Sequence, residues 1–286
     1  ARQKLKPEQI LAIGSHGQTI RHHPELGFSV QIGAPALLAE RCRIQVISDF
    51  RSRDLAAGGE GAPLVPAFHQ WLLEDPEHAR AVINIGGFAN LTLLRPGEPV
   101  TGFDSGPGNI LLDSWIHQHQ GQAFDAEGRW AASGTANEGL VKQLLADPYF
   151  SRPAPKSTGR EYFNTHWLQQ QLQVFGEQLP AADIQASLLE LTAQSIANAL
   201  SMQASDCRDV YICGGGAANT QLLQRLTTML APRKVHTTAK VGVDPDWMEA
   251  MAFAWLAWRC LQEQSGNLPA VTGAKGSRVL GAIYPR

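Results

Sequence analysis

Two glycine turns each follow an apolar, strand-like run of sequence. Gly86-Gly87 comes after A-V-I-N-I, and Gly214-Gly215-Gly216 comes after V-Y-I-C. Glycine lets the backbone come close to a ligand and leaves N–H groups that can face an anion. The second turn also precedes a helix-like run, and a helix N-terminus carries partial positive charge. These turns predict a nucleotide site, with phosphate held by the first and a base or ribose lying against the second.

Each turn also has a plainer interpretation. Gly86-Gly87 fits an ordinary tight hairpin, and the three later glycines fit a flexible strand–helix connection. Neither turn has the G-x-G-x-x-G spacing of a dinucleotide fold or the G-x-x-x-x-G-K spacing of a Walker loop. A nucleotide would therefore be held in another way, with Asn90 as an additional side-chain donor beside the first turn.

A single carboxylate lies between the two turns, in G-F-D-S-G-P-G-N at residues 102–109. This run predicts a loop that presents Asp104 with little side-chain bulk around it. A general base needs a fixed position near its proton, and the G-P-G run leaves room for a substrate to approach. The alternative is a loop aspartate that makes only local turn bonds.

Three further polar residues are candidates for binding a ligand. His16 and Gln18 lie in a polar loop after the strand-like residues 10–14, and ligand sites of open α/β sheets lie at strand ends. Glu249 lies in the first turns of a helix that Asp244-Pro245 begins. The alternatives are a surface loop for the first two and compensation of the helix dipole for Glu249.

The elements that must position these residues alternate between strands and helices, which predicts an α/β chain with a mixed sheet. The G-G turn between residues 81–85 and 91–94 indicates a hairpin. The run at residues 56–63, rich in glycine and small residues, is the best candidate for a crossing between domains. Strands are also expected at residues 10–14, 43–50 and 210–213, and helices at 35–41, 184–200, 220–230 and from 244.

Composition excludes several classes of protein. The 286 residues are 44% hydrophobic and 17% charged, which is typical of a globular chain. A formal net charge of −2 gives no support to a nucleic-acid partner or an anionic membrane partner. No apolar run reaches the length of a membrane span. Four scattered cysteines without C-x-x-C spacing favour neither a zinc site nor a disulfide framework, and fit a reducing cytoplasm.

Seven motifs in order give the sequence a family resemblance. They are G-S-H-G-Q-T (14–19), D-F-R (49–51), A-A-G-G-E-G-A-P-L-V-P (56–66), N-I-G-G-F-A-N-L-T (84–92), G-F-D-S-G-P-G-N (102–109), G-G-G-A-A-N (214–219) and G-V-D-P-D-W-M-E-A (242–250). With these motifs the sequence resembles anhydro-N-acetylmuramic acid kinases, bacterial enzymes of cell-wall recycling. The resemblance runs from about Gly14 to the C-terminus.

The resemblance implies an actin-like, sugar-kinase ATPase (ribonuclease H-like) α/β fold, with two domains around a cleft. Residues 1–52 with about 280–286 would form what remains of the first domain, and residues 53–279 the second. The resemblance also implies a homodimer in the bacterial cytoplasm, with ATP, Mg²⁺ and a sugar as ligands. Asp104 matches the catalytic base, while Glu249, His16 and Gln18 match sugar contacts. The ATP contacts would be Gly86, Gly87, Asn90, Gly214, Gly215, Gly216 and Asn219, with no metal ligand assigned because Mg²⁺ is held mainly through ATP.

The implied reaction combines two steps. Water opens the 1,6-anhydro bond while the γ-phosphoryl group of MgATP moves to O6, which gives N-acetylmuramic acid 6-phosphate. As in an inverting glycosidase, a base must activate water at C1. The departing O6 attacks the phosphoryl group instead of taking a proton from an acid, so one carboxylate suffices. Transfer of the phosphoryl group then needs mainly positioning of the reactants and neutralisation of charge.

The sequence departs from the family at its start. The family begins with a strand–turn–strand that carries a G-T-S-x-D-G phosphate loop, and no such sequence occurs here. The chain is therefore expected to be a family member that lacks its start, with an incomplete first domain. The alternative interpretation is that the chain is an inactive fragment, which binds sugar or nucleotide without transferring phosphate.

Overall fold

The computed structural model describes residues 5–286, which divide by their contacts into two compact units. Unit 1 contains the chain up to Glu74 together with Glu249–Arg286, and unit 2 is Asp75–Met248. This division differs from the predicted boundaries at residues 52 and 280. Residues 53–74 and 249–279 group with the N-terminal part of the chain, whereas the sequence placed them in the second domain.

A buried carboxylate shows why the boundary differs. Asp54 Oδ1 accepts hydrogen bonds from Asn267 Nδ2 at 2.7 Å and from Thr272 Oγ1 at 2.8 Å. The Gly61 N–H donates to the other oxygen of Asp54 at 2.8 Å, and the Glu60 N–H donates to the Thr272 carbonyl at 2.7 Å. The glycine-rich run at residues 56–63 is therefore fixed within unit 1 by the C-terminal part of the chain.

Unit 1 contains two small sheets. Strand β4 (Val46–Ser48) lies between β1 (Ile13–Gly14), which is parallel to it, and β10 (Ala282–Tyr284), which is antiparallel. Strands β2 (Gln18–His23) and β3 (Phe28–Ile32) form an antiparallel hairpin, so Gln18 begins a strand and not the predicted loop. The helices are α1 (Pro35–Cys42), α2 (Ser52–Ala56), α3 (Val65–Leu73), α11 (Met248–Leu261) and α12 (Pro269–Thr272).

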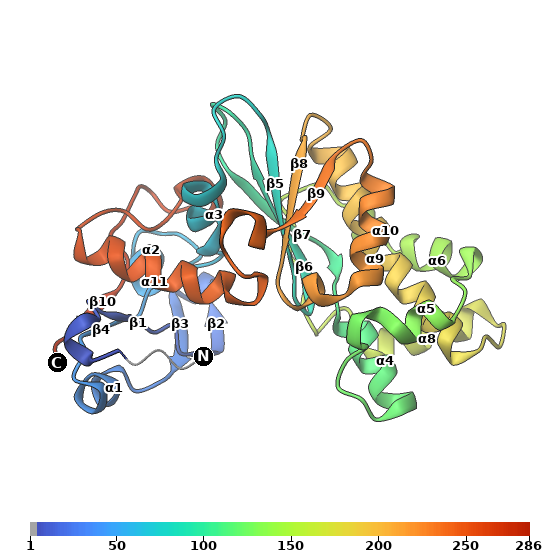
Figure 1. The fold of residues 1–286 in the computed structure, drawn as a ribbon, viewed down its shortest axis with the longest axis horizontal. Helices are drawn as coiled ribbons and strands as arrows, with labels where there is room; N and C mark the ends of the chain where they lie inside the picture. Colours follow the sequence, from blue (N-terminus) through green and yellow to red (C-terminus); the bar gives the residue numbers. More distant parts are fainter. Residues whose placement is uncertain (1–4) are drawn as a thin grey trace. The chain divides into compact units, whose positions relative to one another are not determined.

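Unit 2 is built on a five-stranded sheet in the order β7-β6-β5-β8-β9 (Figure 1). Strands β7 (Thr101–Pro107), β6 (Phe88–Leu94) and β5 (Arg80–Ile85) pair antiparallel, whereas β5, β8 (Asp209–Cys213) and β9 (Lys234–Thr237) pair parallel. The predicted mixed sheet and the predicted hairpin are confirmed, with Gly86-Gly87 as the two-residue turn between β5 and β6.

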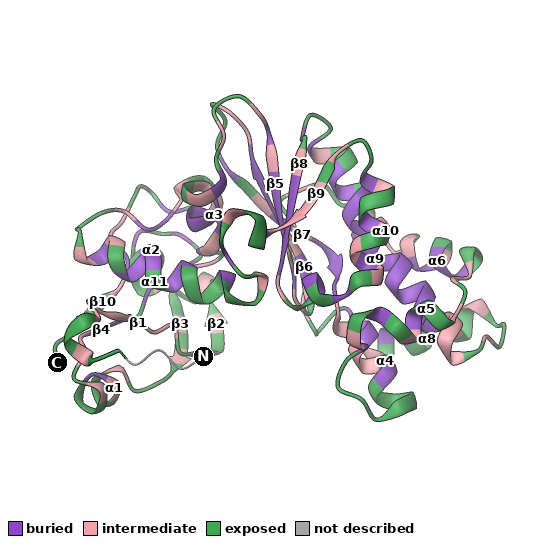
Figure 2. Ribbon diagram, viewed as in Figure 1, coloured by how far each residue is buried: buried purple, intermediate pink, exposed green. Residues whose placement is uncertain are grey.

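Helix α9 (Ala181–Gln203) is the central helix of unit 2 and is buried along most of its length (Figure 2). It packs against β7 and against four helices: α4 (Ile110–Gln120), α5 (Arg129–Ser133), α6 (Glu138–Leu145) and α10 (Thr220–Leu230). Leu188, Leu191 and Ile196 of α9 join Ile83 and Leu91 of the sheet in one core. Helices α7 (Pro148–Ser151) and α8 (Thr165–Phe175) complete the unit.

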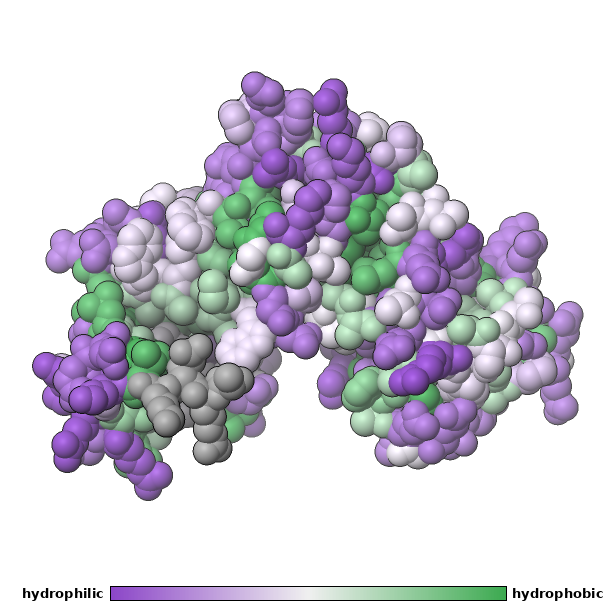
Figure 3. Space-filling model, viewed as in Figure 1, coloured by the Kyte–Doolittle hydropathy of each residue, from purple (hydrophilic) through white to green (hydrophobic). Residues whose placement is uncertain are grey.

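Short 3₁₀ turns lie between several of the helices and strands. The turns are Pro7–Gln9, Pro24–Leu26, Ala126–Gly128, Gly215–Ala218, Thr238–Val241 and Pro245–Trp247. In the face shown in Figure 3, hydrophilic residues occupy much of the surface, and hydrophobic residues form smaller areas between them. Within residues 5–286, every helix is too short or too polar to cross a membrane.

Candidate functional site

Asp104 lies in strand β7 and not in the predicted loop. It pairs with Asn90 of β6, next to an irregularity of the ladder between Ala89 and Asn90. Asp104 Oδ1 accepts a hydrogen bond from Asn90 Nδ2 at 3.0 Å, and Oδ2 accepts one from the Thr158 N–H at 3.0 Å. A cross-strand amide and a loop amide therefore fix both carboxylate oxygens, which is the fixed position that a general base needs.

The surroundings of Asp104 favour a basic carboxylate. Burial raises the pKa of Asp104, while the bonds from Asn90 and the Thr158 N–H act in the opposite direction. Among the ion pairs formed by residues 5–286, none involves Asp104. Neutral donors thus hold the carboxylate without the strong lowering of its pKa that an adjacent cation would cause.

The glycines that follow Asp104 serve packing. A Cβ on Gly106 would lie 2.7 Å from Cε1 of Phe150, and a Cβ on Gly108 would lie 2.5 Å from the Gly86 carbonyl oxygen. Both separations are below van der Waals contact. Close packing against Phe150 and against the hairpin turn therefore explains these two glycines, and room for a substrate beside Asp104 stays a prediction.

The Gly86-Gly87 turn anchors helix α4. The Gly86 carbonyl accepts from the Asn109 N–H at 2.8 Å, and the Gly87 carbonyl accepts from the Ile110 N–H at 3.0 Å. The Gly86 N–H, expected to face phosphate, donates to the Phe88 carbonyl at 3.1 Å. At Gly86 the hairpin interpretation therefore accounts for the backbone, and Asn90, expected beside a phosphate, instead contacts Asp104.

The three glycines after β8 have different surroundings. A Cβ on Gly214 would lie 2.2 Å from Asn84 Oδ1, and a Cβ on Gly216 would lie 2.4 Å from Ile85 Cγ2. Gly215 is exposed, and the nearest atom to its added Cβ, at 3.9 Å, is Asn109 Nδ2. Packing against β5 explains two of the glycines, so Gly215 is the one whose free space can serve a ligand.

A pocket of about 320 Å³ opens beside Gly215. Its lining includes Asp113, Phe124, Asp125 and Asn219. Burial, with the charge of Asp125 as a second cause, raises the pKa of Asp113 to about 6. Carboxylates accept hydrogen bonds from hydroxyl and amino groups and repel phosphate, so these walls suit a ribose and a base better than a phosphate chain.

Sequence reasoning missed Asp113 because its run, I-L-L-D-S-W, indicates only an amphipathic helix. Asn219 caps α10, since its side-chain oxygen accepts from the Leu222 N–H at 3.0 Å. The same side chain lines the pocket. Its contact with ATP stays a prediction.

Unit 1 brings His16 and Arg51 together. Arg51 Nη2 lies 2.8 Å from His16 Nε2, and Arg51 Nη1 donates to the Gly61 carbonyl at 2.7 Å. Because a guanidinium only donates, His16 accepts through Nε2 and is neutral. Burial and the charge of Arg51 lower the pKa of His16, and the charge of Glu249 opposes them. The His16 ring also lies 4.4 Å from the ring of Phe253.

Arg51 is not among the residues predicted from the sequence to bind a ligand, although the motif D-F-R contains it. It has no carboxylate within ion-pair distance among residues 5–286, and its Nε has no hydrogen-bond partner there. That Nε is buried, whereas Nη1 and Nη2 each make one hydrogen bond and keep a second N–H, which suits an anionic group of a ligand. Glu249 is exposed near it and influences its pKa, whereas the side chain of Gln18 makes only a long contact with the adjacent Thr19 carbonyl.

Comparison with known proteins identifies the family. Residues 1–286 match the family described as anhydro-N-acetylmuramic acid kinase. The chain belongs to the anhydro-N-acetylmuramic acid kinase family. It is 59% identical over 283 residues to the anhydro-N-acetylmuramic acid kinase of Pseudomonas fluorescens (strain Pf0-1), covering 99% of this chain and 78% of that protein. It is 52% identical over 281 residues to the anhydro-N-acetylmuramic acid kinase of Thiobacillus denitrificans, covering 98% of this chain and 76% of that protein.

A distant likeness is to the activator of the 2-hydroxyisocaproyl-CoA dehydratase from Clostridium difficile with bound ADPNP. Its TM-score is 0.45 and its identity 14%, over 76% of this chain and 68% of that one. Membership of the kinase family confirms the resemblance found in the sequence. The mixed sheet and the two α/β units fit the actin-like ATPase fold that this resemblance implies.

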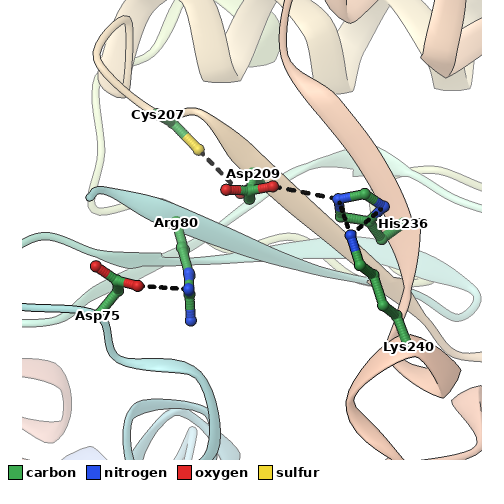
Figure 4. A network of polar contacts seen from close by, with 6 residues as sticks. All are labelled: Asp75, Arg80, Cys207, Asp209, His236 and Lys240. Carbon is green, nitrogen blue, oxygen red and sulfur yellow. Dashed lines mark hydrogen bonds and ion pairs between the residues drawn. The ribbon is translucent and has the colours of Figure 1, made fainter. Parts of the chain in front are cut away.

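A second polar cluster lies away from the candidate site. His236 Nε2 lies 3.2 Å from Asp209 Oδ1 and 2.9 Å from Lys240 Nζ, and Asp75 pairs with Arg80 (Figure 4). Asp209 begins β8, whereas Gly214 follows the end of that strand. The contact between Asp209 and His236 joins β8 to β9, and Arg80 of β5 pairs with Asp75, so we assign these groups to the stability of the sheet. The four cysteines are free.

Proposed function

We propose that this chain is an ATP-dependent kinase that opens the 1,6-anhydro bond of 1,6-anhydro-N-acetylmuramic acid and phosphorylates O6. The product is N-acetylmuramic acid 6-phosphate, as expected of an enzyme that recycles peptidoglycan. The observation that carries the proposal is the carboxylate of Asp104. In a chain of this family, it is held by two neutral donors and its pKa is raised by burial.

Asp104 is proposed to take a proton from the water that attacks C1. The water oxygen then bonds to C1, and the bond between C1 and O6 breaks with its electron pair on O6. That oxygen bonds to the γ-phosphorus, and ADP leaves. The donors from Asn90 and Thr158 occupy one lone pair on each carboxylate oxygen, so others remain available for the proton.

Arg51, His16 and Glu249 are proposed to bind the sugar. The substrate is an acid, and the second N–H groups of Arg51 Nη1 and Nη2 suit its carboxylate. Neutral His16 holds the guanidinium in place. Glu249 is available to accept a hydrogen bond from a hydroxyl or from the N-acetyl N–H, because it is exposed beside this pair.

The pocket beside Gly215 is proposed to hold the adenosine of ATP. Its free space at Gly215 and the carboxylate of Asp113 as an acceptor support a nucleoside. Within residues 5–286 no group of three His, Cys, Asp or Glu side chains is arranged to hold a metal ion. Mg²⁺ is proposed to bind mainly through the phosphates of ATP, where it would neutralise charge on the transferred group.

A homodimer and a cytoplasmic location belong to the same proposal. The four free cysteines support a reducing compartment. Sedimentation equilibrium would test the dimer, and a sedimentation mass of one chain at micromolar concentration would contradict it.

Mass spectrometry tests the function directly. The chain is incubated with 1,6-anhydro-N-acetylmuramic acid and MgATP, with Asp104→Asn as the matched control. We expect ATP-dependent formation of a product that is heavier than the anhydro-sugar by one water and one phosphoryl group. The variant should form little of this product. Binding of both ligands without any product would contradict the proposal and favour the inactive binding fragment.

A further inference from the structure

A cavity of about 330 Å³ lies in unit 2 between β7, α9 and the segment that follows α7. Phe103 and Ser105, the residues on either side of Asp104 in β7, line it, with Phe150 and Ala199 among the other walls. Asp104 does not line it. A cavity of this size is in the range of small-molecule sites. It is therefore distinct from the Asp104 carboxylate and shares a strand with it.

The charged residues in the lining are both cations, Arg152 and Lys156. Within the described part of the chain, no carboxylate lies within ion-pair distance of either. Lys156 Nζ donates to the carbonyls of Tyr149 and Phe150 at 3.1 and 3.3 Å, which leaves a third donor unused. The guanidinium of Arg152 lies 5.7 Å from the centre of the Tyr149 ring. The cavity thus combines aromatic walls with uncompensated positive charge.

The same segment holds Asp104 in place. The Asp104 N–H donates to the Lys156 carbonyl at 2.9 Å, and the Thr158 N–H donates to the Asp104 carboxylate at 3.0 Å. The Tyr149 hydroxyl donates to the Asp104 carbonyl at 2.9 Å. Residues 152–158 have no helix or strand structure of their own. A ligand that contacts Arg152 and Lys156 would therefore restrict the segment that fixes Asp104.

We propose that this cavity is a regulatory site for a small organic anion, a carboxylate, sulfonate or phosphate carried on an apolar body. The anionic group pairs with Arg152 and Lys156, and the apolar body packs against Phe103 and Phe150. Its binding orders residues 152–158. An effect on turnover rests on the proposed function of Asp104, whereas binding and ordering do not.

Two fluorescent probes of similar shape test the binding. One is 8-anilinonaphthalene-1-sulfonate, and the other is N-phenyl-1-naphthylamine, which lacks the sulfonate. Arg152→Gln is expected to weaken the sulfonate about tenfold and to leave the neutral probe nearly unchanged. Arg160→Gln is the matched control, because Arg160 is exposed nearby and does not line the cavity. Equal affinity of the sulfonate for these two variants would overturn the proposal.

Hydrogen–deuterium exchange tests the ordering. We expect the sulfonate to slow exchange in the peptide that contains residues 152–158, in the wild type and in Arg160→Gln. Ala199→Phe fills the cavity and should remove both binding and protection, with circular dichroism as the check that it is folded. If that variant does not fold, Arg152→Gln at saturating probe serves instead and should show reduced protection. Unchanged exchange in the wild type at saturating probe would overturn the proposed ordering.

Discussion

Replacement of Asp104 by asparagine separates basicity from position. The carboxylate accepts two hydrogen bonds, from Asn90 and from the Thr158 N–H. An asparagine has one acceptor oxygen, so its NH₂ group must face one of these two donors. Losing that bond costs about 1–3 kcal/mol of folding stability. Removing a carboxylate whose pKa is raised by burial offsets part of this cost. We therefore expect the free energy of unfolding of the variant to be lower than that of the wild type by about 1–2 kcal/mol at neutral pH.

The catalytic effect should be larger than the structural one. Loss of a general base lowers kcat by about 10²–10⁴-fold, which corresponds to roughly 3–5 kcal/mol of activation free energy. The assay is kcat for formation of the 6-phosphate, with ATP and sugar affinities measured by calorimetry. Both affinities should survive in Asp104→Asn. Near-normal kcat would refute the assignment of Asp104, and Asp49 of the D-F-R motif or Glu249 would then be the next candidates.

Asn90→Ala is the control that keeps the base and removes a donor. The base must be ionised, so activity should fall as pH decreases through the pKa of Asp104, which burial places above the ordinary aspartate value. The bond from Asn90 lowers that pKa. Its removal should therefore move the acid limb of the pH–rate profile to higher pH. If the acid limb of the pH–rate profile does not move in Asn90→Ala, that limb reports the titration of a side chain other than Asp104.

Three further predictions concern other positions. Gly215→Val should weaken ATP binding about tenfold in calorimetry, with little change in melting temperature. Gly216→Val should instead lower the melting temperature, because a Cβ on Gly216, unlike one on Gly215, would clash with Ile85. If Gly215→Val binds ATP as tightly as the wild type, Gly215 is not part of the site. Glu249→Ala should raise KM for the sugar more than the Kd for ATP, and a change in thermal stability alone would instead support the helix-dipole interpretation. The folded-state pKa of Asp113 is raised to about 6, so its contribution to stability is present at low pH and is lost as pH rises through about 6. Chemical denaturation at pH 4 and pH 7 should therefore show Asp113→Asn gaining about 1–2 kcal/mol relative to the wild type at the higher pH, and an equal difference at both values would contradict the shift.

Local sequence patterns predicted the elements whose signals are local. The hairpin around Gly86-Gly87 follows from two apolar runs with a glycine turn between them, and the cap of α10 follows from Asn219 before a helical run. Strand β7 was missed because glycine and proline are rare in strands. As an edge strand with a ladder irregularity beside Asp104, it tolerates Pro107 and Gly106.

Long-range contacts account for the remaining differences. Asp54 meets Asn267 and Thr272 across more than 200 residues of sequence, so a glycine-rich run that resembles a linker lies inside unit 1. The pairing of Arg51 with His16 joins positions 35 residues apart, and no local sequence pattern indicates it. The pocket beside Gly215 depends likewise on Asp113, whose own run carries no sign of a ligand.

The origin of the oxygen at C1 tests the central claim most directly. The reaction is run in ¹⁸O-water with 1,6-anhydro-N-acetylmuramic acid and MgATP, and the product is fragmented in a mass spectrometer. A parallel incubation of unlabelled N-acetylmuramic acid 6-phosphate corrects for spontaneous exchange at C1. If Asp104 directs water to C1 while O6 takes the phosphoryl group, one ¹⁸O should appear at C1 and none in the phosphate. Label in the phosphate group, or a product without label at C1, would contradict the account.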